Sequence, residues 1–176
     1  MPSTINRDMH RLRGKNLGEI REFPEAASQS FKTNDICYVS TSGTLTTFLA
    51  AGNTGTTATT GGTELVIALG PASGTTGNMV SCLIPSQECE MLLAYVNSTS
   101  QIDSVQTAIG DERGLRYAAS GSPAGLTTDM WAADSNSSSN NIVKLVEFDL
   151  TFEPVGVAGN YQLVWCKFLD AARFGR

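Results

Sequence analysis

Apolar residues beyond residue 30 gather into short runs or alternate with polar ones. Runs of this length that are bounded by Gly, Pro, Ser and Asn are typical of β-strands. They predict strands at residues 35–40, 44–49, 64–69, 78–84, 90–97, 142–152 and 161–168. The sequence Thr-Ser-Gly at residues 41–43 predicts a hairpin turn between the first two strands, and residues 70–74 predict a second turn.

The last two predicted strands differ in their patterns. Along residues 142–152, Val146 and Phe148 lie on one face and acidic residues on the other, which predicts a half-buried antiparallel strand. Residues 161–168 are apolar on both faces, which predicts a central strand or a strand covered by a partner. The loop between the two strands contains two glycines, and we expect it to close a hairpin.

Nothing beyond residue 22 has the periodicity of an amphipathic helix. Thr, Ser and Gly make up about 30% of the chain, a composition that suits strands and turns. The fold class predicted is therefore mainly β, a compact antiparallel β-barrel or β-sandwich with an extended N-terminal arm. The polar stretches at residues 52–63 and 134–141 are expected to be exposed loops, or contact loops that become ordered against a partner.

Charge divides the chain into two parts. Residues 1–21 carry a net charge of +3, whereas the rest of the chain carries −8. This predicts a basic arm at residues 1–22 and a β-rich body at residues 23–176. Gly14 and Gly18 interrupt any long helix in the arm, so we expect extended structure with a short helix. A tail without fixed structure is the alternative.

The arm carries apolar and basic side chains that are candidates for contact with a partner protein. Ordering such an arm on a surface costs backbone entropy, which buried apolar side chains would have to offset. The cations would steer the encounter and help to set the register. The candidate residues are Ile5, Arg7, Met9, Arg11, Leu12, Arg13, Lys15, Leu17, Ile20 and Arg21.

The sequence offers little to catalysis. The one histidine, His10, lies in the arm and is a poor partner for a nucleophile. The carboxylate pairs Glu88/Glu90 and Asp111/Glu112 are expected to be solvated surface. No phosphate-binding loop and no nucleophile-elbow motif is present, and the cysteines lack the spacing of a zinc site. We therefore expect no enzymatic activity, no cofactor and no metal.

Composition also bears on the compartment and the partners. The chain contains no run of 18 apolar residues, and no apolar segment follows its basic start, so neither a membrane span nor a signal peptide is expected. Synthesis in a cytoplasm favours buried free thiols at Cys37, Cys82, Cys89 and Cys166, although a disulfide between Cys82 and Cys89 is an alternative. The basic arm could contact phosphates, but the acidic body disfavours nucleic acid.

Three stretches of the chain carry a resemblance to a known family. Residues 31–45, with the sequence FKTNDICYVSTSGTL, resemble the opening of the small β-barrel proteins that decorate tailed-phage capsids. Residues 108–117 (AIGDERGLRY) are similar to a turn that these proteins place before their closing strands. Residues 143–148 and 163–168 resemble their final hairpin.

The resemblance implies a decoration, or cement, protein. Such a protein is a structural component on the outer surface of the virion, made in the host cytoplasm, which binds the major capsid protein and clamps neighbouring subunits. We also expect the chain to form a small homo-oligomer on the shell. The alternative function is a carbohydrate- or receptor-binding β-module of a tail or fibre, for which Trp131 is the candidate exposed aromatic side chain, whereas Trp165 is expected in the core.

Overall fold

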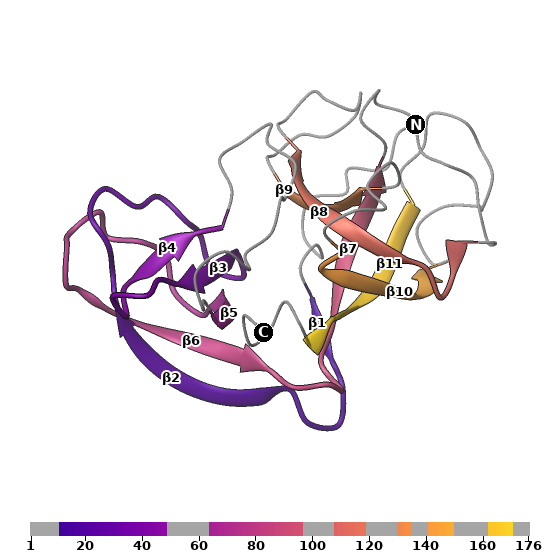
Figure 1. The fold of residues 1–176 in the computed structure, drawn as a ribbon, viewed down its shortest axis with the longest axis horizontal. Helices are drawn as coiled ribbons and strands as arrows, with labels where there is room; N and C mark the ends of the chain where they lie inside the picture. The colour runs from indigo at the N-terminus through magenta and orange to yellow at the C-terminus, as the bar shows by residue number, and fades with distance from the viewer. Residues whose placement is uncertain are drawn as a thin grey trace.

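The computed structural model describes residues 11–48, 64–96, 108–118, 130–134, 141–149 and 162–170. Strands dominate these ranges (Figure 1). They are β1 (Leu12–Arg13), β2 (Gly18–Pro24), β3 (Ile36–Val39), β4 (Leu45–Thr47), β5 (Glu64–Ala68), β6 (Met79–Pro85), β7 (Glu90–Val96), β8 (Glu112–Ala118), β9 (Met130–Asp134), β10 (Val143–Asp149) and β11 (Gln162–Phe168).

The seven strands predicted from the sequence are all present, as β3, β4, β5, β6, β7, β10 and β11. The mainly β class is confirmed, and two sheets of mostly antiparallel strands fit a sandwich-like arrangement. Four strands were missed. Two of them, β1 and β2, lie in the segment predicted as an arm, and β9 ends at Asp134, the first residue of the predicted polar loop at 134–141.

The first sheet has the strand order β2-β6-β5-β3-β4. The hairpin predicted at residues 41–43 joins β3 to β4, and the Gly43 N–H donates to the Ser40 carbonyl at 2.8 Å. Gly43 has a φ of 79°, in the left-handed region that glycine adopts without steric cost. Just beyond β2, Glu25 forms an isolated parallel bridge with Leu45 of β4, so the two outer strands of this sheet approach each other.

The second sheet has the order β1-β7-β11-β10-β8-β9, and β9 pairs in addition with β7, in parallel. Each strand in the series β7, β11, β10, β8 and β9 therefore pairs with the next, and the last strand, β9, pairs with the first, β7. The strand β11 lies between β7 and β10, which explains why it is apolar on both faces. Its antiparallel pairing with β10 is the one that the sequence predicted.

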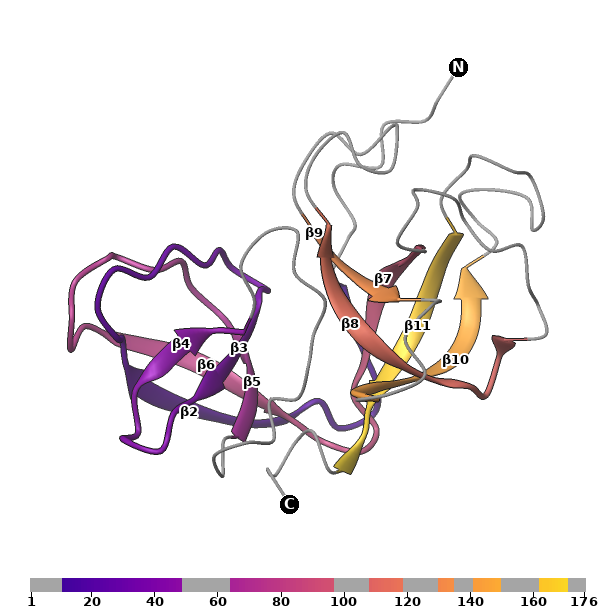
Figure 2. The same cartoon turned by 45° about the horizontal axis from the view of Figure 1, so that its top comes forward.

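The two sheets repeat one topology. Without β1, the second sheet reads β7-β11-β10-β8-β9, and replacing each strand by the fifth one before it gives β2-β6-β5-β3-β4, the order of the first sheet. In both units the strands that come first and third along the chain also approach each other in parallel. In the first unit Glu25, just beyond β2, contacts Leu45 of β4, and in the second unit β7 pairs with β9. The described residues thus form two successive five-strand units with the same strand order, which Figures 1 and 2 show as two neighbouring lobes.

A β-bulge in β10 changes which of its side chains lie on the buried face of the sheet. The register with β11 pairs Leu145 with Cys166 but Glu147 with Trp165, so Val146 is the extra residue. The buried residues on the two sides of the bulge are Leu145 and Phe148. The alternation predicted for residues 142–152, with Val146 and Phe148 on one buried face, is therefore wrong at Val146, which is only half-buried.

The hydrophobic core joins the two sheets. One face of the first sheet, including Ile36, Leu65 and Ile67, packs into the same apolar cluster as Leu93 and Val164 of the second sheet. The other face of the first sheet forms a second cluster, which contains Cys37, Val39, Val66, Ala68, Val80, Cys82 and Ile84. Both faces of β5 are therefore buried, which accounts for the uninterrupted apolar run of that strand.

The basic segment that the sequence predicted as an arm is built into both sheets from residue 12 onward. β1 pairs with β7 (Leu12 with Met91), and β2 pairs with β6 (Gly18 with Pro85). These two pairings share one antiparallel register, so residues 12–24 and 79–91 form a continuous two-stranded ribbon across the two lobes. We call it the N-terminal ribbon. The boundary predicted at residue 22 falls inside β2, and no helix occurs between residues 11 and 24.

Candidate interaction surface on the N-terminal strands

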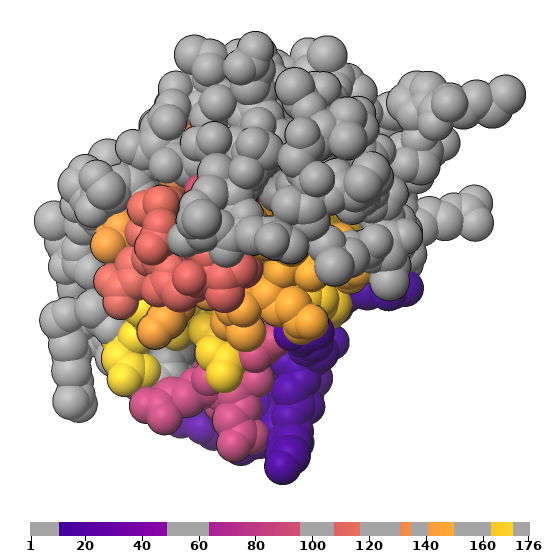
Figure 3. All heavy atoms as spheres, turned by 90° about the vertical axis from the view of Figure 1, so that its right-hand side faces the viewer, coloured from indigo at the N-terminus to yellow at the C-terminus, as the bar shows by residue number. Residues whose placement is uncertain are grey.

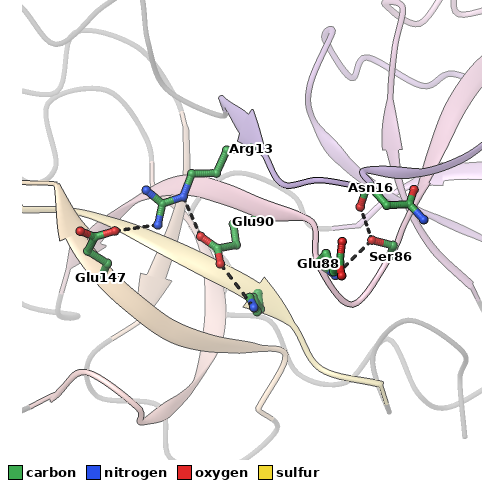
Figure 4. A network of polar contacts seen from close by, with 7 residues as sticks. Arg13, Asn16, Ser86, Glu88, Glu90 and Glu147 are labelled. Carbon is green, nitrogen blue, oxygen red and sulfur yellow. Dashed lines mark hydrogen bonds and ion pairs between the residues drawn. The ribbon is translucent and has the colours of Figure 1, made fainter.

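Arg13 is the most strongly held side chain of the N-terminal ribbon (Figure 4). Its Nε atom lies 2.7 Å from Glu90 Oε2, and its Nη2 atom lies 2.8 Å from Glu147 Oε2. The guanidinium carbon also lies 4.2 Å from the centre of the Trp165 ring, which is a cation–π distance. Burial lowers the pKa of Arg13, but hydrogen bonds with Glu147 and Glu90 outweigh that effect and raise the pKa above its ordinary value.

The carboxylate of Glu90 is shared between two cations. Besides Arg13, the Nζ of Lys167 lies 3.4 Å from Glu90 Oε1. Since Glu90 belongs to β7, Arg13 to β1 and Lys167 to β11, the carboxylate connects three neighbouring strands. Glu90 therefore acts as a structural ion-pair partner with a side chain that is only 13% exposed. The solvated surface expected for this carboxylate pair is found at Glu88, which is exposed, and not at Glu90.

The segment between β1 and β2 is tied to the segment between β6 and β7. The Ser86 hydroxyl donates to the Asn16 carbonyl, and the Ser86 N–H donates to the Leu17 carbonyl at 2.9 Å. In turn, the Ser86 hydroxyl accepts a hydrogen bond from the Glu88 N–H at 3.1 Å (Figure 4). Hydrogen bonds therefore hold together the two segments that connect the lobes, one between β1 and β2 and the other between β6 and β7.

Gly14 and Gly18 permit the close approach of these two connections. Their φ angles are 144° and 133°, values that side-chain-bearing residues rarely adopt. A Cβ atom at Gly14 would overlap the carbonyl oxygen of Glu88, and one at Gly18 would overlap that of Ile84. The sequence identified both glycines only as interruptions of a helix, whereas the structure uses them where the ribbon crosses from one sheet to the other.

The candidate contact residues fall into three groups. Leu12 packs against the shared core and Arg13 is paired as described, so the fold itself uses both side chains. Arg11 and Lys15 are exposed, as are Leu17 (37%), Ile20 (64%) and Arg21. Ile5, Arg7, Met9 and also His10 lie outside the described residues.

Residues 18–22 form an exposed strand edge, which we call the β2 edge. All five residues are exposed, and β2 is the outer strand of its sheet in the described chain. Within this edge, Arg21 Nε and Nη2 donate to Glu19 Oε1 and Oε2 at 2.9 and 2.7 Å. The hydrogen bond from Arg21 lowers the pKa of the Glu19 carboxyl below its ordinary value.

The surface of the second lobe differs from this edge. Figure 3 shows β10 and β11 beside the magenta atoms of the 64–96 segment and the indigo atoms of the N-terminal segment. Arg113 is paired with Asp111 at 2.5 Å, and Arg116 with the buried Asp134 at 3.5 Å. Both arginines are thus paired within the lobe. Asp111, expected from the sequence to be solvated surface, is partly exposed and forms one half of an ion pair.

Glu25, next to β2, is a fully buried carboxylate. It accepts hydrogen bonds from the Ser73 N–H and hydroxyl, both at 2.9 Å, and from the Gly74 N–H at 2.7 Å. Burial alone would raise the pKa of Glu25, but these hydrogen bonds outweigh it and hold the pKa below its ordinary value. The carboxylate anchors the turn at residues 70–74 to the end of β2.

The cysteines are buried free thiols, as the sequence predicted, and Cys82 and Cys89 form no disulfide. Burial raises the pKa of Cys82 to about 12 and raises the pKa values of Cys37 and Cys166 as well. Thiols with raised pKa values are poor nucleophiles and poor metal ligands at neutral pH. In the described ranges, no group of three His, Cys, Asp or Glu side chains could hold a metal ion.

Trp131 is fully buried, so it cannot form the exposed aromatic site that the carbohydrate-binding alternative requires. Its ring centre lies 5.5 Å from that of Phe48, inside the cluster that joins the two sheets. Trp165 is also buried, as expected. Over the described ranges, no helix has the length and apolar character needed to cross a membrane.

Neither a family model nor a curated protein nor a solved structure matches this chain. In the described residues, fold and surface geometry define a mainly β protein of two units with the same strand order, joined by an N-terminal ribbon in which residues 18–22 are exposed.

Proposed function

We propose that this chain is a structural virion protein that binds the outer surface of a tailed-phage capsid and cements neighbouring major capsid subunits. Two observations support the proposal. One is the resemblance to capsid decoration proteins, which covers most of residues 31–170 and is carried by residues 31–45, 108–117, 143–148 and 163–168. The other, which carries most weight, is the repeat of one strand order in two adjoining units.

A cement protein must hold two neighbouring subunits at a set distance. Two β units of the same topology supply two contact bodies within one chain. The shared apolar core and the crosslinked ribbon resist their separation, because pulling them apart would expose Ile36, Leu65 and Ile67 to water. A clamp of this kind transmits load through packing and backbone pairing.

The contact residues proposed on the N-terminal ribbon are those that remain exposed. They comprise Arg11, Lys15, Leu17, Ile20 and Arg21, together with Ile5, Arg7 and Met9 of the preceding segment. Leu12 and Arg13 contribute indirectly, by fixing the ribbon to the second lobe. The major capsid protein is the proposed partner on the shell.

The test is binding of the purified chain to capsids of the phage that encodes it, stripped of this chain. Co-sedimentation and cryo-electron microscopy should place the chain on the outer surface, and bound shells should rupture at a higher temperature than bare ones. Absence of the chain from purified particles, or shells that neither bind it nor gain stability, would refute the proposal.

A deletion variant separates the role of the N-terminus from that of the fold. Removing residues 1–22 would delete β1 and most of β2 and so damage both sheets. Removing residues 1–10 leaves every described strand intact. We expect this shorter variant to keep its unfolding temperature and to bind stripped shells more weakly than the full chain.

A further inference from the structure

We propose that the β2 edge is a self-association site, at which residues 18–22 pair antiparallel with the same residues of a second copy of this chain. The twofold axis would pass between the two Ile20 residues. This dimer would use Ile20 and Arg21, which are also proposed above as shell contacts, so the exposed residues left for the shell in the paired state would be Arg11, Lys15 and Leu17.

Equivalent strands of the two lobes differ in how their outer sides are covered. β2 and β7 occupy the same position in the two strand orders. The outer side of β7 is covered at its start by β1, which pairs Leu12 with Met91 and Arg13 with Glu90, and at its end by β9. In the described part of the chain no strand covers the corresponding stretch of β2, which lies along the outer side of its lobe (Figure 1). In the described residues, the β2 edge is therefore free to pair with a strand at the place where β1 pairs with β7 in the second lobe.

The second observation is the direction of the backbone groups. The Leu17 carbonyl accepts from Ser86, and the Glu25 N–H donates to Asn78 at 2.8 Å, so both residues direct their groups toward the β6 side. Because this direction alternates along a strand, Ile20 and Glu22 direct theirs away from β6. Ile20 opposite Ile20 would form a hydrogen-bonded pair in which each N–H donates to the carbonyl of the other copy.

The third observation is that the side chains are self-complementary. With Ile20 opposite Ile20, Glu19 faces Arg21 of the second copy, and Arg21 faces its Glu19. These are non-hydrogen-bonded pairs, in which directly opposite side chains lie closest. Ile20, the most exposed large apolar side chain of the described residues at 64%, would bury its surface against its counterpart.

The charges select one register among the possible ones. Shifting the second copy by two residues in one direction places Glu19 opposite Glu19, and shifting it in the other places Arg21 opposite Arg21. Like charges directly opposite each other destabilise a strand pair. A parallel arrangement in register would also bring like charges together. Only the antiparallel pairing centred on Ile20 matches both ion pairs and the apolar pair.

The test uses sedimentation velocity and native mass spectrometry of the full chain over a wide concentration range. The short edge implies a weak dimer, so concentrations up to about 1 mM are needed. The charge reversals E19R and R21E should each weaken the dimer about tenfold or more, because each places two like-charged pairs across the axis. The double variant E19R/R21E should dimerise like the unmodified chain.

Mixing the two single variants gives the sharpest result. Positions 19 and 21 are both basic in the E19R variant and both acidic in the R21E variant, so every pair facing across the axis of a mixed dimer has opposite charges. An equimolar mixture should therefore form a heterodimer more readily than either variant forms a homodimer by itself. The control K15E changes the net charge as R21E does but lies outside the paired residues, and it should leave the dimer unchanged. Circular dichroism would verify that every variant is folded.

Three outcomes would overturn the proposal. They are an unmodified chain that stays monomeric at all concentrations, single variants that dimerise normally, and a mixture that forms no heterodimer. If the chain stays monomeric but binds a capsid protein through the β2 edge, the self-association proposal is wrong and the capsid protein is the partner of that edge. Loss of capsid binding with an intact dimer would refute only the capsid proposal.

Discussion

The guanidinium carbon of Arg13 lies 4.2 Å from the centre of the Trp165 ring, which joins β1 to β11 although neither strand pairs with the other. The same guanidinium bridges Glu90 and Glu147 on β7 and β10. One side chain from the N-terminal ribbon thus contacts three strands of the second lobe. The basic charge of this segment serves the fold at Arg13, and it remains available to partners at Lys15 and Arg21.

Replacing Arg13 by alanine should destabilise the protein. Solvent partly screens the ion pairs, since the Arg13 side chain is 39% exposed, so we expect a loss of about 1 kcal/mol in the free energy of unfolding. Urea unfolding followed by tryptophan fluorescence measures it. Arg21→Ala is the matched control, because Arg21 forms its ion pair with exposed Glu19. Equal effects of the two changes would contradict the structural role of Arg13.

Alanine at Gly18 should be more harmful than alanine at Gly43. Both glycines have positive φ angles, but a Cβ at Gly18 would overlap the Ile84 carbonyl, whereas at Gly43 nothing lies within 4 Å. We expect Gly43→Ala to cost about 1 kcal/mol and Gly18→Ala at least about 2 kcal/mol. Thermal unfolding would compare them. Similar unfolding temperatures would show that the ribbon does not need its close approach.

Glu25→Gln should reduce stability in a pH-dependent way. The folded-state pKa of Glu25 lies below its ordinary value of 4.5, so the ionised carboxylate stabilises the fold above about that pH. This contribution is lost as the pH falls through the lower folded-state pKa. We expect a deficit of about 1–3 kcal/mol at pH 7 that shrinks below about pH 4.

Urea titrations at a series of pH values would measure the Glu25→Gln deficit. The control is Glu88→Gln, which alters an exposed carboxylate. A deficit that stays constant with pH, or one matched by the Glu88 variant, would contradict the role of the Glu25 carboxylate as the anchor of its turn.

The four thiols should be inert in the folded protein. All are buried, and burial raises the pKa values of Cys37, Cys82 and Cys166, so the thiolate that reacts with a disulfide reagent is scarce. With Ellman's reagent at pH 8, we expect a negligible fast phase in buffer and four reactive thiols in guanidinium chloride. A thiol that reacts rapidly in the native protein would contradict this arrangement.

The amino-acid sequence by itself determined the strands whose apolar residues follow a local pattern, such as 64–69 and 161–168, and the burial of the cysteines and Trp165. Local patterns are informative there because a β-branched or large apolar side chain in a short run can be covered only by becoming part of a core. The turn at residues 41–43 was predictable for a similar reason, because Gly43 permits a left-handed backbone.

Only the tertiary structure decided the pairing partners. Residues 12–24 look like a charged tail because their charge is a local property, whereas their pairing with residues 79–91 depends on contacts 55 to 79 positions away. The bulge at Val146 and the burial of Trp131 follow from neighbouring strands in the same way. The repeated strand order, the exposed β2 edge and the buried Glu25 arise from long-range packing, which no local pattern along the chain records.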